Sequence, residues 1–309
     1  MKAIFFEWQD YEEYVAKKYN LFNNVDIDIQ FYSQKFDINL CKGADIISIF
    51  VDSRLSEQDL DKLLLNGCNR ILLRCAGFNM LNVEYAKKLG IKICRVASYS
   101  PESIAEYVFA LLLNLCRRMN HERTKHQNFQ NGRTIKSMGF VLKNKTLGLY
   151  GYGNIAKEVA KIGRDGFGMK IVFFDPYIKS PSVDMQVESL PELFSLSDVV
   201  SIHVPLNQET RYTVNAKILE NIKADNFTLI NTARGEIIQS EDLIEFLNNG
   251  RVKYFGTDVW RDDDKFDGRL LTENTFQADH VAFLTEKAVL SILNQTKESI
   301  ENPKIENVL

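Results

Sequence analysis

The residues of this sequence with the clearest chemical signature form a glycine-rich turn, Gly151-Tyr152-Gly153-Asn154-Ile155-Ala156. An apolar segment typical of a buried strand, Thr146–Tyr150, runs directly into this turn, and a segment with helical character, residues 157–163, follows it. Strand, G-x-G-x-x-A turn and helix in this order are typical of sites that bind dinucleotides. Gly151 permits the tight turn, Gly153 lets the main chain approach a pyrophosphate, and the final alanine lets the helix pack against the strand. Amide groups at the start of the helix then bind the anion.

An acidic residue stands where a dinucleotide site of this kind needs one. The next predicted strand, residues 170–174, is followed by Asp175, 22 residues after Gly153. At that distance a carboxylate accepts hydrogen bonds from the adenine ribose hydroxyls. The same negative charge would repel a 2′-phosphate, so the sequence favours NAD over NADP as the cofactor. A solvated turn residue is the alternative interpretation of Asp175.

Short apolar segments alternate with helical patterns along the whole chain, and they must position these residues. The expected strands are residues 3–6, 46–51, 70–75, 91–95, 146–150, 170–174, 199–204, 227–230 and 252–257. Such alternation is typical of parallel sheets that are covered on both faces. The chain of 309 residues is longer than one ordinary domain, so we expect two α/β domains.

A helix that is apolar on nearly every side is predicted over residues 102–119. Ser100-Pro101 before it is a favourable N-cap and first-turn pair. The lack of a polar face indicates that this helix is buried between two domains. Residues 121–136 are polar and basic without a clear period, as expected of an exposed connection or an arm. Residues 281–300 are expected to form a late helix that folds back on the first half of the chain.

The composition indicates a cytoplasmic protein that acts on small molecules. A net charge of -3 and a pI near 5.9 predict no basic surface for nucleic acid or an anionic membrane. The longest apolar run, residues 107–116, is about half the length that crosses a bilayer, and residues 1–10 do not resemble a signal peptide. The 5 cysteines lack paired or metal-type spacing, which indicates reduced thiols and no metal site.

Several ordered motifs resemble the D-2-hydroxyacid dehydrogenase family, in particular its D-lactate dehydrogenase-like branch. They extend from about residue 46 to residue 289 and include the glycine-rich turn. The other motifs are Arg74-Cys75-Ala76-Gly77-Phe78-Asn79, Tyr99-Ser100-Pro101-Glu102-Ser103-Ile104-Ala105-Glu106, His203-Val204-Pro205-Leu206, Asn231-Thr232-Ala233-Arg234-Gly235 and His280-Val281-Ala282-Phe283-Leu284-Thr285. Their order and spacing together make the resemblance specific.

The resemblance implies an α/β fold of two Rossmann-like domains, each with a doubly wound parallel sheet. The substrate domain is expected to be discontinuous and flavodoxin-like, over residues 1–99 and 281–309, with the NAD-binding domain over residues 100–280. The active site is expected in the cleft between them. The helix at residues 102–119 and the arm after it resemble the family's dimer-forming region, so a homodimer is expected.

The resemblance also implies a reaction, the reversible transfer of a hydride between NAD and carbon 2 of a small keto acid to give the D-2-hydroxy acid. Arg234 matches the family arginine that binds the carboxylate and polarises the carbonyl, a task suited to a bidentate guanidinium. His280, one of 4 histidines, matches the family's proton donor. A surface arginine in a turn and a structural histidine are the alternative interpretations.

The acidic partner of the histidine is where the sequence departs from the family. Asp258 matches the family aspartate near the nicotinamide, and five positions later, where the family has glutamate, stands Asp263. Aspartate is shorter by one methylene, about 1.5 Å. Either the loop moves inward or the coupling to His280 is weaker. Asp262 or Asp264 is an alternative partner, and a solvated loop is the alternative interpretation of all three aspartates.

The remaining site residues are also implied by the resemblance. Main-chain N–H groups of Ala76 and Gly77 resemble the family's cradle for the substrate carboxylate, to which Tyr99 is also expected to donate. Phe50, Tyr99 and Phe283 match positions that line the substrate side chain, and three rings would leave room for a methyl group, which predicts pyruvate. Plain core positions are the alternative. The further cofactor-binding residues expected are Asn154, Ile155, Pro205, Ala233 and Asp258.

Two rival functions are weighed against this prediction. An NAD-binding sensor or corepressor on the same fold would need little catalysis, because a fold does not fix a function. Arg234 and His280 argue against it, whereas Asp263 leaves it open. Phosphoglycerate dehydrogenase is disfavoured, because no basic cluster for the phosphate can be assigned.

Overall fold

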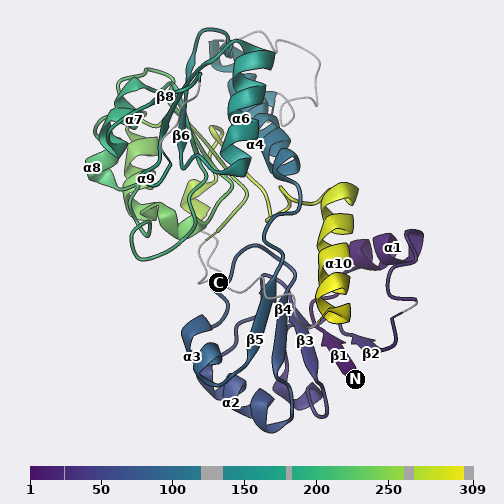
Figure 1. Cartoon of the computed structure of the whole chain (residues 1–309). Helices are drawn as coiled ribbons and strands as arrows, with labels where there is room; N and C mark the ends of the chain where they lie inside the picture. The colour runs from purple at the N-terminus through teal and green to yellow at the C-terminus, as the bar shows by residue number, and fades with distance from the viewer. Residues whose placement is uncertain (24, 120–134, 179–182, 261–267, 303–309) are drawn as a thin grey trace. The chain divides into compact units, whose positions relative to one another are not determined.

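The computed structural model describes residues 1–23, 25–119, 135–178, 183–260 and 268–302, which belong to two compact units (Figure 1). The first unit comprises Met1–Ser100 and Leu284–Leu309, and the second comprises Pro101–Phe283. These boundaries lie within a few residues of the expected ones at residues 99 and 281. The first unit is therefore assembled from two segments that are far apart in the sequence.

The first unit is built on a five-stranded parallel sheet of order β2-β1-β3-β4-β5. Its strands are β1 (Lys2–Phe5), β2 (Asp28–Phe31), β3 (Ile46–Ile49), β4 (Arg70–Leu73) and β5 (Lys92–Arg95). Its helices are α1 (Asp10–Lys18), η1 (Ile38–Leu40), α2 (Glu57–Leu65), α3 (Val83–Lys88) and α10 (Glu286–Glu301). This strand order is that of flavodoxin-like folds, so the expected fold of the discontinuous domain is confirmed.

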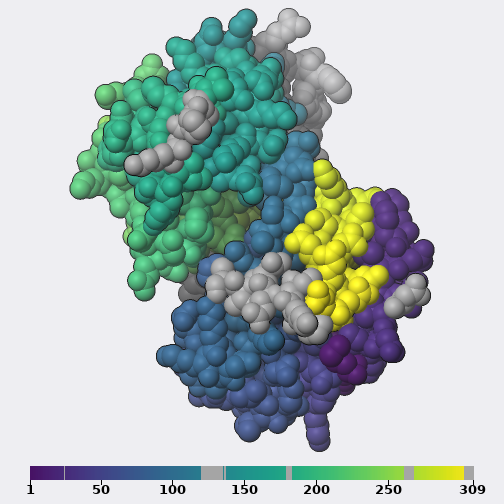
Figure 2. All heavy atoms as spheres, in the orientation of Figure 1, coloured from purple at the N-terminus to yellow at the C-terminus, as the bar shows by residue number. Residues whose placement is uncertain are grey.

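Helix α10 completes the core of the first unit. Its residues Val289, Leu293 and Ile300 are buried in one apolar cluster with residues of the first strands, among them Ala3 and Phe5. Figures 1 and 2 show α10, in yellow, beside α1, in purple. At the start of α10 the Glu286 carboxylate accepts hydrogen bonds from Lys18 Nζ and the Tyr19 hydroxyl, both at 2.6 Å. The N-terminal strands and the last helix therefore fold as one body.

The second unit contains a seven-stranded parallel sheet of order β12-β11-β10-β9-β6-β7-β8. Its strands are β6 (Thr146–Tyr150), β7 (Lys170–Phe174), β8 (Met185–Gln186), β9 (Val199–Ile202), β10 (Thr228–Asn231), β11 (Tyr254–Thr257) and β12 (Thr275–Gln277). Its helices are α4 (Pro101–Cys116), η2 (Ile135–Ser137), α6 (Asn154–Lys161), η3 (Ile162–Gly166), α7 (Leu190–Leu196), α8 (Ala216–Leu219), η4 (Gly235–Ile237), α9 (Ser240–Asn248) and η5 (Gly268–Leu270). Strands β6 to β11 follow the 3-2-1-4-5-6 order of dinucleotide-binding Rossmann folds, which confirms the predicted class.

Apolar side chains cover both faces of this second sheet. Strands β9, β10 and β11 are buried at every residue, which explains why most of their residues are apolar. One apolar cluster includes residues of α4 and α6, and the other includes residues of α7, α8 and α9. Because the strands are parallel, their carboxyl ends lie at the same edge of this sheet, which is covered on both faces.

Three helices differ from their expected bounds for local reasons. Helix α4 ends at Cys116 instead of residue 119, and among the described residues no helix is long and apolar enough to span a bilayer. Helix α6 ends at Lys161 and continues as the wider turn of η3. The late helix begins at Glu286, not at residue 281, because the Thr285 hydroxyl caps it by accepting from Ala288 N. The amides of Val281 and Ala282, before the helix, donate to the Asp258 carboxylate.

Three strands were not expected from the sequence. Strands β2, β8 and β12 have exposed or half-buried residues at most positions, so they lack the uniformly apolar pattern of the central strands. Both β2 and the pair β8 and β12 lie at the edges of their sheets. An edge strand has a partner on one side only, and its sequence is correspondingly less constrained.

Candidate active site

The glycine-rich turn between β6 and α6 has the geometry that a dinucleotide requires. Gly151 has a φ of +89°, and a Cβ atom there would lie 2.9 Å from the main-chain carbonyl carbon of His203 and 2.9 Å from Val204 Cγ1. A Cβ atom on Gly153 would instead meet nothing within 4 Å. Helix α6 begins at the next residue, Asn154, so its first N–H groups face this open space. The residues present therefore fit a pyrophosphate held by main-chain donors.

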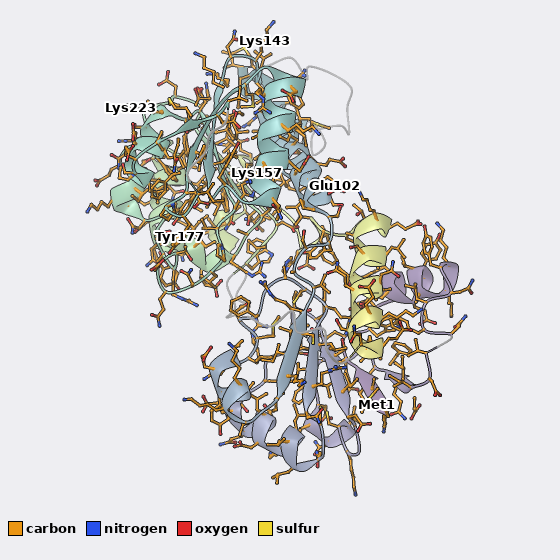
Figure 3. The ribbon with its side chains drawn as sticks, in the orientation of Figure 1. Met1, Glu102, Lys143, Lys157, Tyr177 and Lys223 are labelled. Atoms are coloured by element: carbon orange, nitrogen blue, oxygen red, sulfur yellow. The ribbon has the colours of Figure 1, made fainter. Side chains whose placement is uncertain are left out.

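Asp175 lies directly after β7 and holds the same turn. Its Oδ2 accepts from Tyr152 N at 2.8 Å, and its Oδ1 accepts from Tyr177 N at 2.9 Å and Ile178 N at 3.1 Å. A carboxylate has about four acceptor positions, so capacity is left for a ribose hydroxyl. The exposed Tyr177, labelled in Figure 3, also donates from its hydroxyl to Glu209 at 2.5 Å. The loop after β7 is thus tied to the loop after β9.

A buried polar network behind the turn was not predicted from the sequence. The Tyr152 hydroxyl donates to the Asp184 carboxylate, whose other oxygen accepts from Arg164 Nη1 at 2.7 Å. The Tyr152 ring stacks on Phe173 with 3.9 Å between ring centroids. Tyr152 occupies a variable position of the fingerprint, so the motif itself carries no signal for this role. The network connects the turn to the chain between β7 and β8.

Candidate catalytic residues of the second unit lie at the carboxyl edge of its sheet. Arg234 stands three residues after the end of β10, Asp258 directly follows β11, and His280 stands three residues after β12. Pro205 and Ala233, expected at the cofactor, follow β9 and β10 in the same way. The carboxyl ends of parallel strands share one edge, so these residues lie on the same side as the glycine-rich turn. Ligands of open α/β sheets bind at this edge.

Asp258 fixes the backbone that carries His280. The Asp258 side chain is buried, with its Oδ1 accepting from Val281 N at 2.9 Å and its Oδ2 from Ala282 N at 2.7 Å. His280 N donates to the Asp258 main-chain carbonyl at 2.8 Å. His280 has a φ of 54°, a left-handed conformation that is uncommon for residues other than glycine. Burial raises the pKa of Asp258 to about 6, against the opposing effect of the two amide donors.

The surroundings of His280 disfavour its charged form. Burial, together with the nearby Arg234 guanidinium, lowers the pKa of His280 to about 4. Arg234 Nη1 donates to the Ala233 carbonyl at 2.6 Å, and the Phe283 ring lies edge-on to the imidazole with 6.4 Å between centroids. A histidine that protonates a substrate near neutral pH therefore needs an anion beside it. The expected partner Asp263, like its two neighbouring aspartates, lies outside the described residues.

The second buried histidine of this unit plays a different part. His203 N donates to the Tyr150 carbonyl at 2.7 Å, and its main chain packs against Gly151. Burial lowers the pKa of His203 to about 3. Its imidazole is therefore neutral, and its main chain is the part that lies against the glycine-rich turn. His121 and His126 lie outside the described residues.

The substrate-side residues of the first unit also follow strand ends. Phe50 directly follows β3 and is buried, Ala76 and Gly77 follow β4 by three and four residues, and the half-buried Tyr99 follows β5. The structure brings them to the carboxyl edge of the first sheet. Of the three expected aromatic residues, Phe283 belongs to the second unit, where it lies beside the candidate proton donor.

Arg95 is a neighbour of the carboxylate cradle that sequence reasoning missed. It ends β5, its Nη1 donates to the Ala76 carbonyl at 2.6 Å, and its guanidinium lies 5.5 Å from the Phe78 ring centroid. The hydrogen bond turns the Ala76 carbonyl toward Arg95 and fixes the orientation of the peptide that links Ala76 to Gly77. The position of Arg95 at the end of a predicted strand was the available signal, but the resemblance to the family, which singled out Arg234, did not include this residue.

Comparison with known proteins gives the family. A family model described as "D-isomer specific 2-hydroxyacid dehydrogenase, NAD binding domain" matches residues 109–284. The D-lactate dehydrogenase of Escherichia coli (strain K12) is 32% identical, with 98% of this chain and 96% of that protein covered. The apo-structure of D-lactate dehydrogenase from Escherichia coli covers 98% of this chain and 97% of its own, at 31% identity and a TM-score of 0.86. A D-lactate dehydrogenase structure from Aquifex aeolicus covers 97% and 94%, at 29% identity and a TM-score of 0.83.

This chain belongs to the D-isomer-specific 2-hydroxyacid dehydrogenase family, in its D-lactate dehydrogenase-like branch. It is an NAD-dependent enzyme that acts on a small 2-hydroxy or 2-keto acid. NAD, when bound, supplies or accepts the hydride. The turn from Gly151 to Ala156 and the Asp175 carboxylate are the described residues that fit it.

The effect of Arg234 on the pKa of His280 can be tested directly. Replacing Arg234 by Gln removes the nearby positive charge, so we expect the pKa of His280 to rise toward its ordinary value. An NMR titration of the imidazole carbon signals in the unliganded enzyme measures this pKa. Arg269→Gln, at an exposed arginine paired with Glu241 in the same unit, is the control and should leave it unchanged. Equal titration curves for Arg234→Gln and the unmodified enzyme would contradict the assignment.

Proposed function

We propose that the enzyme reduces pyruvate to D-lactate with NADH, and that the reaction is reversible. Relatives support this choice of substrate. The Escherichia coli relative is a D-lactate dehydrogenase, a structure 28% identical to this chain is described as the pyruvate reductase of Chlamydomonas reinhardtii, and the Aquifex aeolicus structure is complexed with NAD and lactic acid. The observation that carries the proposal within this chain is Arg234 near a partly buried His280, whose backbone Asp258 holds in place.

Each catalytic role is assigned to the group whose chemistry suits it. The Arg234 guanidinium binds the substrate carboxylate and stabilises the negative charge that develops on the carbonyl oxygen. His280 donates a proton to that oxygen during reduction and accepts it during oxidation. Asp258 has no direct part in this proton transfer. It holds the amides of Val281 and Ala282, so the imidazole stays in place from one turnover to the next.

His280 becomes a useful acid only with an anion nearby. In its described surroundings its pKa is about 4, too low for an imidazolium at neutral pH. The substrate carboxylate is one such anion. It also compensates the positive charge of Arg234, and that charge is one cause of the low pKa of His280. We assign the second anion to Asp263. Together they favour the protonated imidazole when the substrate is bound.

The first unit is proposed to provide further contacts to the substrate carboxylate and to contact the substrate side chain. The N–H groups of Ala76 and Gly77, oriented by the hydrogen bond from Arg95, bind the carboxylate, and the Tyr99 hydroxyl donates to it. Phe50 forms the wall against the substrate side chain. A small pocket follows from bulky aromatic residues at these positions, and it admits a methyl group most readily.

Two further assignments complete the proposal. All five cysteines are buried and have no paired spacing in the sequence, which fits the reducing interior of a cell, so we place the enzyme in the cytoplasm. A sensor or corepressor without catalysis, the alternative raised by Asp263, is not favoured. The relatives that match most of this chain are named as dehydrogenases.

We also propose that the enzyme is a homodimer. Four exposed apolar residues follow α4 or lie in the segment that packs on its end, where Phe140 N donates to the Cys116 carbonyl. They are Met119, Ile135, Met138 and Val141, with exposed fractions of 57%, 88%, 70% and 72%. Such a group of apolar residues at the surface is typical of an interface.

Substrate size is the first test of this function. We expect pyruvate to exceed 2-ketoisocaproate and phenylpyruvate by about 5- to 150-fold in kcat/KM, because a larger side chain must displace a packed ring. Phe50→Ala should shift the ratio toward the larger substrates. Phe31→Ala, at an exposed position on β2, is the control and should keep it. An unmodified enzyme that prefers phenylpyruvate would refute the pyruvate assignment.

The acid partner is tested by the pH dependence of reduction. The Asp263 carboxylate stabilises the imidazolium, which is the active form for reduction, so Asp263→Asn lowers the pKa of His280. The pH at which kcat/KM for pyruvate falls to half should therefore decrease. Asp262→Asn and Asp264→Asn are matched controls that remove the same charge from adjacent positions. If one of these shifts the profile and Asp263→Asn does not, the partner is that neighbour.

Assembly is tested by sedimentation. We expect about 71 kDa at micromolar concentration, twice the chain mass of 35.6 kDa. Ile135→Asp should lower the mass toward that of one chain, because it introduces a charge into the proposed interface. Val183→Asp alters a residue of equal exposed fraction, 88%, elsewhere in the same unit and should not. A stable monomer of the unmodified chain would overturn the proposal.

A further inference from the structure

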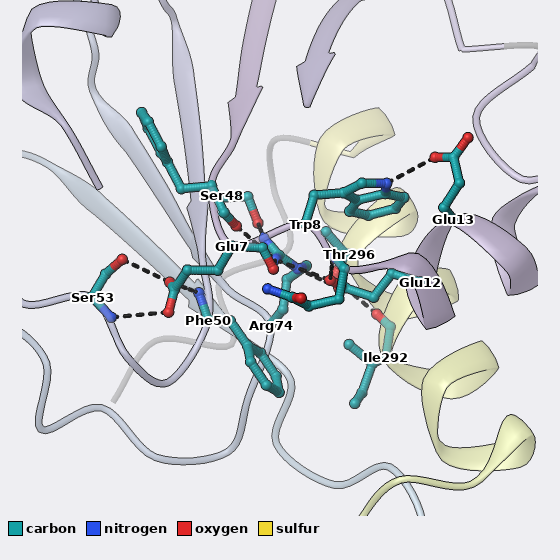
Figure 4. Close-up of polar contacts among 12 residues, drawn as sticks. Glu7, Trp8, Glu12, Glu13, Ser48, Phe50, Ser53, Arg74, Ile292 and Thr296 are labelled. Carbon is teal, nitrogen blue, oxygen red and sulfur yellow. Dashed lines mark hydrogen bonds and ion pairs between the residues drawn. The ribbon is translucent and has the colours of Figure 1, made fainter. Parts of the chain in front are cut away.

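A buried glutamate at the end of β1 holds the segment that carries Phe50 (Figure 4). Glu7 stands two residues after β1, with a side chain that is buried and a φ of 57°. Its Oε2 accepts from Phe50 N and the Ser53 hydroxyl, both at 2.7 Å. Its Oε1 accepts from Asp52 N at 2.7 Å and Ser53 N at 3.0 Å. One carboxylate therefore receives four hydrogen bonds, all from residues 50–53.

Arg74 fixes both the glutamate and the Phe50 ring. Its Nη2 donates to the main-chain carbonyls of Phe6 at 2.8 Å and Glu7 at 3.2 Å, and its guanidinium lies 5.8 Å from the centroid of the Phe50 ring. Its Nε donates to Glu12 at 2.8 Å. Phe50 is thus held at its backbone by Glu7 and at its ring by Arg74.

Stability alone does not account for this arrangement. Glu7, Glu12 and Arg74 have exposed fractions of 3%, 2% and 0%, so two carboxylates and one guanidinium are removed from water. Burying such groups costs free energy, and apolar residues of similar volume are often as stabilising. What the charged groups add is a fixed geometry, because each charge-assisted hydrogen bond has a preferred length and direction. The geometry fixed here is that of the segment at the end of β3.

We propose that Glu7 is a specificity-determining positioning residue, which sets the size of the accepted keto acid by fixing Phe50. This inference rests on the proposed function, in which Phe50 is the wall against the substrate side chain. Glu7 itself does not touch the substrate. With Glu7 impaired, residues 50–53 lose their common acceptor, the Phe50 ring moves more freely, and larger side chains are admitted.

Glu12 provides the matched control. It belongs to the same buried cluster and binds Arg74, but its other described contact is with Gln9 N at 3.0 Å, at the start of α1. Glu7→Gln and Glu12→Gln each remove one negative charge from the cluster. Only Glu7→Gln places an NH₂ group opposite donors of residues 50–53, where it cannot accept from them. A purely electrostatic or structural role predicts similar consequences for both variants.

The experiment is a double-mutant cycle on substrate preference. We would measure kcat/KM for phenylpyruvate and for pyruvate in the unmodified enzyme and in Glu7→Gln, Phe50→Ala, the double variant and Glu12→Gln. Thermal unfolding and the affinity for NADH are measured alongside. We expect Glu7→Gln to raise the phenylpyruvate-to-pyruvate ratio by at least about twofold, and to have no further effect on this ratio when Phe50 is already Ala. Glu12→Gln should change the ratio less than Glu7→Gln does, because it leaves all four hydrogen bonds to residues 50–53 in place.

The outcomes separate this inference from the proposed function. If Phe50→Ala leaves the ratio unchanged, the wall is wrong and this inference falls with it. If Phe50→Ala changes the ratio but Glu7→Gln does not, or does so equally in both backgrounds, the wall stands and the role of Glu7 is refuted. Should Glu7→Gln fail to fold, Ser53→Ala removes one of the four donors and keeps the charge. It should shift the ratio in the same direction, and an unchanged ratio there would also refute the role.

Discussion

Loops that leave the carboxyl end of a parallel sheet carry amide groups that have lost their strand partners, and buried or half-buried carboxylates accept hydrogen bonds from them in this enzyme. Asp258 accepts from Val281 and Ala282, Asp175 from the turn around Tyr152, and Glu7 from residues 50–53. An unsatisfied buried amide costs free energy comparable to a lost hydrogen bond. Each carboxylate therefore determines where one loop can lie. The glycine-rich turn predicted to bind the cofactor, the proposed proton donor His280 and the proposed wall residue Phe50 all lie on such loops.

The same device has different chemical consequences in the two units. Near His280, the Asp258 carboxylate accepts hydrogen bonds from main-chain amides. Burial and the neighbouring Arg234 guanidinium lower the pKa of His280 to about 4. In the first unit, Arg74 binds the Glu12 carboxylate and the main-chain carbonyl of Glu7, and the Glu7 carboxylate fixes the backbone of residues 50–53.

The sequence predicted what depends on local pattern. The strand, the glycine-rich turn and Asp175 lie close together along the chain, and most residues of the central strands are apolar, so the fold class and a candidate cofactor site could be predicted. Contacts chosen by tertiary structure were not. Glu7 and Phe50 are separated by 43 positions and Asp258 and Val281 by 23, and nothing in the spacing connects them. The late helix begins at Glu286 and not at residue 281, because the Thr285 hydroxyl caps it there by accepting from Ala288 N.

The dependence of the first unit on α10 has a consequence for biosynthesis. Ala3 and Phe5 share their core with Val289 and Ile300, and the ribosome makes all of Pro101–Phe283 in between. At about 5 to 20 residues per second, the nascent first unit waits on the order of 10 to 40 s for its last helix. During that interval its apolar strand residues lack the part of their cover that α10 provides. The newborn protein is therefore a client for chaperones that bind exposed apolar segments, and a nonsense codon before α10 would leave a product that aggregates although every proposed catalytic residue had been translated.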